Sequence, residues 1–297
     1  MSRKVAVVTG SNSGIGFQVV KALAESWDGD VIMCAMDEDR LQRARLEIQD
    51  LPSVNQSVKS AIKFAVLRID KKDSVQSMKD RLINEYGGLD ILVNNAGMAY
   101  LVEENESLLS MATETINVNT LGTALVCDIL FPILRPGARV VNMSSSAGML
   151  RRIPGQELRQ RLGSNSLTRQ EWQQMVEEYL NDIREGVLVT KGWPHPGITP
   201  FSSYTVSKVF VSALTWIQHR NFSKDSRQDI VVNAVHPGYI KTELTGNKGF
   251  FTPKEGARAP TICALIPPEG EPRGNMVTLD GSVVDWHNDY IRGGASS

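Results

Sequence analysis

Residues 4–16 read KVAVVTGSNSGIG, and this stretch decides the fold class. Its first part, Lys4–Thr9, is a β-branched apolar run that ends at Gly10, which is typical of a buried strand in a parallel sheet. Glycines at positions 10, 14 and 16 permit a tight turn and the close approach of a ligand to the backbone. A helical pattern, Ile15–Glu25, follows at once. A strand, a glycine-rich turn and a helix in this order are the context in which a helix N-terminus binds phosphate groups.

Short apolar runs and helical patterns alternate along the first two-thirds of the chain. Further strands are expected at residues 30–35, 62–69, 89–93, 139–143, 230–234 and 276–279. Helices are expected at residues 37–50, 75–86 and 202–221, with two more between 108 and 134. Such alternation implies parallel strands joined by helical crossovers. We therefore predict an α/β fold with a Rossmann-like, doubly wound parallel sheet. Since no stretch resembles a linker, we expect residues 1–297 to form a single domain.

An insertion at about residues 150–201 interrupts this alternation. A capping box, Thr168-Arg-Gln-Glu171, opens a helix within it. An apolar stripe at helical spacing follows, which Gly186 ends. The stripe consists of Trp172, Met175, Val176, Tyr179 and Ile183. It must pack on a surface, which can belong to its own domain or to a partner.

Composition excludes several classes of function. The formal net charge of −1 gives no reason to expect binding to nucleic acid or to an acidic membrane. No apolar stretch approaches the roughly 20 residues that span a bilayer, and the N-terminus does not resemble a secretory signal. The three cysteines and four histidines lack the spacing of a zinc site. We expect no bound metal, reduced thiols and a cytoplasmic protein.

Tyr204 and Lys208 are four residues apart in a predicted helix, so their side chains share one face. A tyrosine with a pKa of about 10 is a poor acid at neutral pH, but a neighbouring ammonium lowers that pKa. Such a phenol can give a proton to a carbonyl oxygen while a hydride reaches the carbonyl carbon. Ser145 ends a predicted strand at the edge of the sheet where ligands bind, and its hydroxyl can hold the same oxygen. Taken alone, the Tyr-x-x-x-Lys pattern is more typical of a solvated helix face.

Several motifs together resemble the short-chain dehydrogenase/reductase family over nearly the whole chain. They are TGxxxGIG at residues 9–16, Asn94-Asn95-Ala96-Gly97, Asn119, Ser144-Ser145, Tyr204-Thr-Val-Ser-Lys208 and Pro237-Gly238, in the order typical of the family. The resemblance implies that Ser145, Tyr204 and Lys208 are catalytic. It also implies that Asn119 supports catalysis by holding a water on the lysine.

The same resemblance implies a set of cofactor-binding residues. Asp70 matches the aspartate that binds adenine, and Asn95 lies in the turn that touches the cofactor. The remaining residues that it implies are Gly10, Ser11, Ser13, Gly14, Ile15 and Gly16 in the first turn, Tyr204 and Lys208, and Pro237, Gly238, Ile240 and Thr242 around the carboxamide.

Within the family, the chain is most similar to the monomeric carbonyl reductases. The resemblance rests on GGLDILVNNAG at residues 87–97, Glu185-Gly-Val, Gly192-Trp-Pro194, Leu265-Ile-Pro-Pro268 and the long insertion. In that group the insertion covers the surface through which other members tetramerise, which implies a monomer here. The implied reaction is reduction of a ketone, aldehyde or quinone by NADPH.

Three places depart from this pattern. NADPH-specific relatives carry basic residues where this chain has Ser13 and Met36, and NAD-specific relatives carry an aspartate where it has Ala35. Arg40 and Arg43 lie close enough in sequence to reach a phosphate, so we expect NADP, with NAD not excluded. His236 replaces a reactive cysteine of some carbonyl reductases and is expected to be a structural loop residue. Residues 195–201 are longer than in the relatives, which can change substrate preference.

Two other functions remain open on the sequence. An NAD-dependent secondary-alcohol dehydrogenase would run the same chemistry in the opposite direction. A non-catalytic dinucleotide-binding redox sensor would keep the glycine turn but would have no need of a proton donor. The sequence does not identify the physiological substrate.

Overall fold

A computed structural model describes residues 3–49, 61–100, 107–195, 202–287 and 291–292. The strands form one nine-stranded sheet in the order β3-β2-β1-β4-β5-β6-β7-β8-β9. Neighbouring strands are parallel from β3 to β7, and β8 and β9 add an antiparallel edge. The strands are β1 Val5–Val8, β2 Asp30–Ala35, β3 Ile62–Val66, β4 Leu89–Asn94, β5 Leu134–Met143, β6 Val231–His236, β7 Met276–Thr278, β8 Val283–Val284 and β9 Ile291–Arg292. The predicted doubly wound α/β fold is confirmed.

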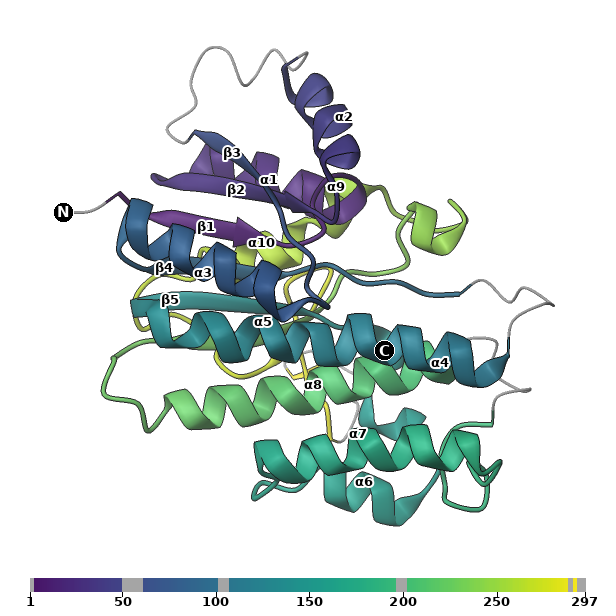
Figure 1. Ribbon diagram of the computed structural model, residues 1–297. Helices are drawn as coiled ribbons and strands as arrows, with labels where there is room; N and C mark the ends of the chain where they lie inside the picture. The colour runs from purple at the N-terminus through teal and green to yellow at the C-terminus, as the bar shows by residue number, and fades with distance from the viewer. Residues whose placement is uncertain (1–2, 50–60, 101–106, 196–201, 288–290, 293–297) are drawn as a thin grey trace.

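Helices cover both faces of the sheet and make three layers (Figure 1). One face carries α1 (Gly14–Ser26), α2 (Glu38–Gln49) and α10 (Arg258–Ala264), beside the short α9 (Pro253–Gly256). The other carries α3 (Lys72–Tyr86), α4 (Leu108–Ile116), α5 (Thr123–Leu130) and α8 (Ser202–Phe222). From β1 the sheet grows in one direction through β2 and β3, and in the other direction through β4, β5 and β6. The strand order therefore reverses between β1 and β4, which are parallel neighbours. Ligands of open α/β sheets bind at the carboxyl ends of the strands at such a reversal.

The two helices expected between residues 108 and 134 are present as α4 and α5, but no loop separates them. The segment is one helical run, Leu108–Ile133, in which a π-helical turn at Asn117–Gly122 joins α4 to α5. The wider turn shifts the apolar face, so the 3.6-residue pattern breaks although the helix continues. The run is long and apolar enough to cross a membrane by length and composition, contrary to expectation, but half of its apolar window is buried inside the fold.

Two strand boundaries also differ from expectation. β5 begins at Leu134, five residues before the predicted start at Arg139, and includes Pro136 and Gly137, which pattern reading assigns to turns. Its pairing with β4 shifts register between Leu89 and Ile91, which accommodates this irregular start. β3 ends at Val66, because residues 67–69 leave the sheet.

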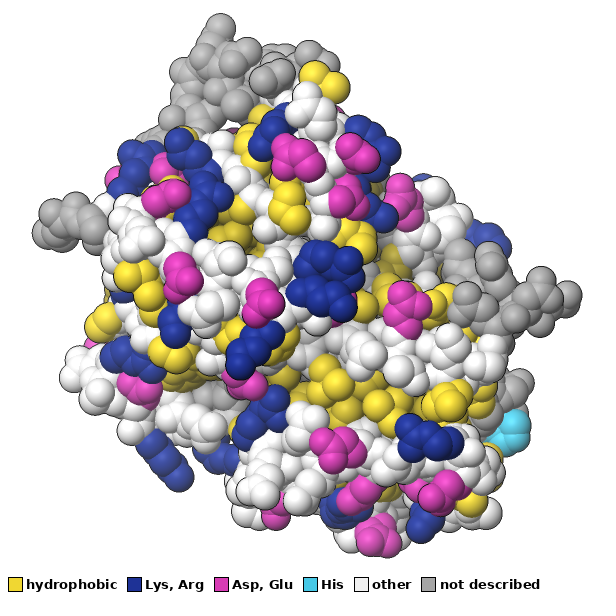
Figure 2. All heavy atoms as spheres, viewed as in Figure 1, with side chains coloured by type: hydrophobic (Ala, Val, Ile, Leu, Met, Phe, Trp, Pro, Cys, Tyr) yellow, Lys and Arg dark blue, Asp and Glu magenta, His cyan; other side chains and the backbone are white. Residues whose placement is uncertain are grey.

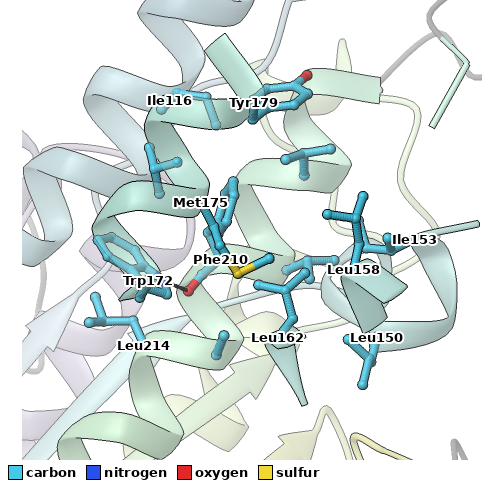
Figure 3. Packing of buried hydrophobic residues seen from close by; sticks show 14 of the residues in the cluster. Ile116, Leu150, Ile153, Leu158, Leu162, Trp172, Met175, Tyr179, Phe210 and Leu214 are labelled. Atoms are coloured by element: carbon cyan, nitrogen blue, oxygen red, sulfur yellow. Dashed lines mark hydrogen bonds between the residues drawn. The ribbon is translucent and has the colours of Figure 1, made fainter. Parts of the chain in front are cut away.

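The insertion folds into α6 (Gln156–Leu162) and α7 (Arg169–Arg184) and packs on the main domain. The predicted capping box at Thr168 and Glu171 is present. The apolar stripe of α7 is buried, and Figure 3 shows it facing residues of α4 and α8. The indole Nε1 of Trp172 donates a hydrogen bond to the backbone oxygen of Phe210 at 2.9 Å. The insertion therefore covers α8 from the outside.

Charged side chains are mixed over the surface. Figure 2 shows Lys and Arg interspersed with Asp and Glu on the face that it presents, which agrees with the formal net charge of −1. On the described part of that face, positive and negative charges alternate. They therefore do not form the continuous positive surface that would attract nucleic acid.

Candidate active site

The glycine turn after β1 is closed against the turn after β4. Gly10 has a φ of 56°, and a Cβ atom built on it would lie 2.7 Å from the Cα atom of Ala96. A Cβ on Gly16 would lie 2.4 Å from Nδ2 of Asn95. That Nδ2 donates hydrogen bonds to the backbone oxygens of Thr9 and Gly10, at 3.0 and 2.8 Å. Only glycine fits these two positions, and Asn95 fixes the shape of the turn.

The first turn of α1 has the properties of an anion site. Its N-cap residue, Ser13, makes no side-chain capping bond, so the first backbone N–H groups receive no acceptor from it. These groups and the positive end of the helix dipole favour a phosphate. Thr242, from the loop after β6, lies on the opposite side of this helix N-terminus. A Cβ atom built on Gly14 would lie 3.3 Å from the Cγ2 atom of Thr242. The cradle therefore fits the pyrophosphate of a dinucleotide.

Ser11 faces away from this cradle. Its hydroxyl, which is buried, donates to the backbone oxygen of Val8 at 2.7 Å and accepts from the N–H of Cys34 at 3.0 Å. Its own N–H donates to the oxygen of Cys34. Ser11 therefore joins β1 to β2, and its contribution to a ligand would come through the shape of the turn.

The side chains expected at the adenosine end are held in ion pairs. The Asp70 carboxylate accepts from Arg68 at 2.8 Å and lies 3.6 Å from the Lys71 amine. The hydrogen bond from Arg68 lowers the pKa of Asp70. Arg40 lies 3.3 Å from the Asp37 carboxylate at the start of α2, where it is about half exposed.

Ser145 and Tyr204 form the centre of the site. Ser145 follows β5, and its hydroxyl accepts from the N–H of Ala147 at 3.1 Å. Its interaction with the phenol of Tyr204, a residue of α8, lowers the pKa of Tyr204. Burial has the larger, opposite effect, so the pKa of Tyr204 is raised overall. The structure thus places the two hydroxyls together at the carboxyl edge of the sheet.

Lys208 lies beside this pair. Its Nζ atom is 5.6 Å from the centre of the Tyr204 ring and donates to the backbone oxygen of Met143 at 2.7 Å. The side chain is buried, and desolvation lowers its pKa to about 8. The expectation of a lowered pKa for Tyr204 is wrong for this geometry, because burial of the phenol raises that pKa by more than the other effects lower it.

Asn119 lies in the π turn and binds both neighbouring segments. Its Oδ1 accepts from the N–H of Met98 at 2.8 Å. Its Nδ2 donates to the Met98 oxygen at 2.9 Å and to the Ser207 hydroxyl at 3.0 Å. A Cβ on Gly97 would lie 3.2 Å from Oδ1 of Asn119 and 3.6 Å from Nζ of Lys208. Asn119 therefore lies next to the amine, whereas Ser207 and Met98 are contacts that the sequence motifs do not identify.

The loop after β6 supplies the remaining predicted residues. Pro237 is followed by Gly238, which has a φ of 89°. Ile240 is buried against Gly256 of α9. His236 is mostly buried, which lowers its pKa, and its Nδ1 accepts from the N–H of Gly238 at 3.4 Å. The expectation of a loop residue is wrong in its placement, because His236 is the last residue of β6 and pairs with Thr278 of β7.

Metal chemistry finds no support in the described part of the chain. No group of three or more His, Cys, Asp or Glu side chains is placed there to hold a metal ion.

Comparisons with known proteins identify the family of this chain. Residues 4–156 match the family model described as short chain dehydrogenase. The chain is 38% identical over 289 residues to carbonyl reductase [NADPH] 1 of Mus musculus, covering 96% of this chain and 99% of the relative. It is 37% identical over 286 residues to the Homo sapiens protein of the same name, with coverage of 95% and 98%.

Solved structures show the same fold. Salutaridine reductase from Papaver somniferum superposes with a TM-score of 0.79 and 28% identity, over 92% of this chain and 99% of that one. NADPH-bound carbonyl reductase from chicken fatty liver superposes with a TM-score of 0.66 and 21% identity, over 96% and 99%, and so supports the fold alone. This chain belongs to the short-chain dehydrogenase family.

Proposed function

We propose that the protein is an NADPH-dependent carbonyl reductase that converts a ketone, aldehyde or quinone to the corresponding alcohol or hydroquinone. The observation that carries the proposal is that Ser145 and Tyr204 lie next to each other, with the Lys208 amine 5.6 Å from the centre of the tyrosine ring. The relatives named carbonyl reductase [NADPH] match nearly the whole chain and support the same reaction.

The chain's own residues handle the proton. NADPH, when bound, supplies the hydride to the carbonyl carbon. Burial raises the pKa of Tyr204, so the phenol is protonated at neutral pH and acts as the acid toward the carbonyl oxygen. The Ser145 hydroxyl orients that oxygen. After the proton has left, the Lys208 ammonium stabilises the phenolate, because opposite charges attract strongly in a buried site.

The cofactor is held by the glycine turn, the α1 N-terminus and the loop after β6. Asp70 lies at the adenosine end and Asn95 supports the turn. Ser13 and Met36 supply no positive charge for a 2′-phosphate, so that contact falls to Arg40, with Arg43 as the alternative. An arginine suits a phosphate because its planar guanidinium donates several hydrogen bonds.

The protein works as a monomer in the cytoplasm. The apolar stripe of α7 is buried on its own α4 and α8, where it takes up the surface that a partner would need. All three cysteines are free and buried, and burial raises the pKa of each thiol to about 12. Free thiols of this kind suit a reducing compartment.

The acid role of Tyr204 is tested by Tyr204→Phe. We expect turnover of NADPH with quinones, isatin-like diketones and aliphatic aldehydes to fall by about 10²–10⁴-fold, because the proton donor is lost. NADPH binding, followed by fluorescence, should be retained. Tyr179→Phe is the matched control, since Tyr179 is a buried tyrosine whose hydroxyl also lies beside a serine, Ser203 at 3.3 Å.

Three outcomes would contradict the proposal. Near-normal turnover in the Tyr204 variant would remove the acid role. A wild-type protein that binds cofactor but reduces none of these carbonyls would instead be a dinucleotide-binding sensor. A tenfold preference for NADH would favour the NAD-dependent alcohol dehydrogenase.

A further inference from the structure

Ser207 lies between the π turn and the two functional side chains of α8. Its hydroxyl donates to the backbone oxygen of Tyr204 at 2.7 Å and accepts from Nδ2 of Asn119 at 3.0 Å. Its own backbone oxygen accepts from the Thr120 hydroxyl at 3.3 Å. Two consecutive residues of the π turn therefore bind the residue that precedes Lys208.

The Asn119 amide depends on this serine. Both Nδ2 hydrogens are used, one by Met98 and one by Ser207, and Asn119 and Ser207 are both buried. If the serine hydroxyl were removed, one N–H of the amide would lose its partner in a place with no access to bulk water. A buried donor without an acceptor costs free energy, so the amide would turn or the helices would separate slightly.

The same cluster reaches Lys208 from the other side. Gly97 lies against both Asn119 and Lys208, and Met98 follows it on the turn after β4. The turn after β4, the π turn and α8 therefore meet at Asn119, and Ser207 is the point at which α8 joins them.

We propose that Ser207 is a positioning residue, which locks α8 to the π turn through Asn119 and so sets where the Tyr204 phenol and the Lys208 amine stand. The kinetic part of this inference rests on the proposed reductase activity. Ser207 itself touches neither substrate nor cofactor in the proposed mechanism.

The groups that face the Tyr204 phenol determine how its pKa would change if the Lys208 amine moved. From α8 the facing group is the charged Lys208 amine, and from the loop after β5 it is the neutral Ser145 hydroxyl. An amine that drifts away from the phenol stabilises the phenolate less, so its displacement raises the pKa of Tyr204.

The test compares Ser207→Ala with Thr215→Val. Thr215 is a matched control on the same helix: its buried hydroxyl donates to the backbone oxygen of Val211 at 2.9 Å and accepts from Nδ2 of Asn142 at 2.9 Å. Both variants remove a hydroxyl that bonds to its own helix and to a buried asparagine. A structural role alone predicts the same behaviour for both.

We expect Ser207→Ala to lower kcat by about 10–100-fold, since small displacements of positioned groups have effects of this size. The KM for NADPH should stay within about threefold, and the pH profile of kcat should move to higher pH. Thr215→Val should lower the melting temperature by a similar amount and leave the kcat profile in place. Equal kcat profiles in the two variants would overturn the inference.

A second readout does not need turnover. The phenol of Tyr204 is titrated by ultraviolet difference spectra of the NADP⁺ complex, with Tyr204→Phe subtracted in each background. We expect the phenol to titrate at higher pH in Ser207→Ala than in wild type, and at an unchanged pH in Thr215→Val. If wild type reduces no carbonyl, the proposed function fails, whereas this titration still decides the role of Ser207.

The path of the effect is tested with Asn119→Ala. Since Ser207 acts through the Asn119 amide, adding Ser207→Ala to Asn119→Ala should change kcat by less than about twofold. Independent effects that multiply in the double variant would show that the serine does not act through Asn119, and would overturn the proposal.

Discussion

The side-chain amine of Lys208 donates a hydrogen bond to the backbone oxygen of Met143, the last residue of β5, at 2.7 Å. This bond brings a charged group of α8 to the carboxyl edge of the sheet, where it is buried next to Tyr204. Burial lowers the pKa of Lys208 from its ordinary 10.5 to about 8, so the fold is stabilised less when this amine carries its charge. Placing the charged Lys208 amine beside Tyr204 therefore lowers the stability of the folded protein.

Lys208→Met should make the protein more stable while abolishing turnover. The free energy of unfolding at pH 7 should rise by about 1–3 kcal/mol, because the buried charge is removed and the lost bond to Met143 offsets part of the gain. Since the folded pKa is the lower one, the unfolded chain binds more protons between pH 8 and pH 10.5, and wild-type stability rises with pH across that window. The advantage of the variant should shrink over the same range.

Denaturant unfolding at pH 7 and pH 10 measures this difference. Lys63→Met is the control, because Lys63 is an exposed lysine of β3 and its replacement should change stability by no more than about 0.5 kcal/mol. A variant at position 208 that is less stable than wild type at both pH values would show that the burial of this amine carries no such cost.

Cofactor choice should depend on Arg40. Arg40→Ala should raise the KM for NADPH by about 10–100-fold, the value of a hydrogen bond to a charged group, and leave the KM for NADH unchanged. Asp70→Ala should weaken both cofactors alike, since adenine is common to them. Arg45→Ala is the control on the same helix, because Arg45 is held by Glu38 at 2.8 Å and lies over the Phe64 ring. Steady-state kinetics with both cofactors would contradict the assignment if Arg40→Ala affected them equally.

Local signals in the chain predicted much of this architecture. The glycine turn, the capping box at Thr168 and the stripe that contains Trp172 each act over a few residues, so each is readable without knowing the fold. The spacing of Tyr204 and Lys208 is equally local. The motifs therefore located the correct helices and strand ends, although boundaries such as the start of β5 differed.

Features that depend on contacts between distant segments were not predictable in this way. The π turn leaves no local signal beyond a broken apolar pattern, so residues 108–134 looked like two helices. Ser207 lies inside the Tyr204-Thr-Val-Ser-Lys208 motif, but nothing local indicates its bond with Asn119, which lies 88 residues away. The sign of the Tyr204 pKa shift depends on how deeply the phenol is buried, and only the folded structure determines that.

The packing of α7 predicts that Trp172→Ala is strongly destabilising and exposes an apolar surface. Trp172 is fully buried, its ring lies edge-on to Phe210 with centroids 6.0 Å apart, and the Arg169 guanidinium lies 4.5 Å over it. Its loss should lower the free energy of unfolding by about 3–5 kcal/mol. Because α7 covers α8, the variant should also form larger assemblies than wild type at the same concentration, as measured by size-exclusion chromatography with light scattering. Gln174→Ala, on the exposed side of α7, should do neither. A wild-type tetramer that Trp172→Ala leaves unchanged would mean that α7 is not what prevents assembly.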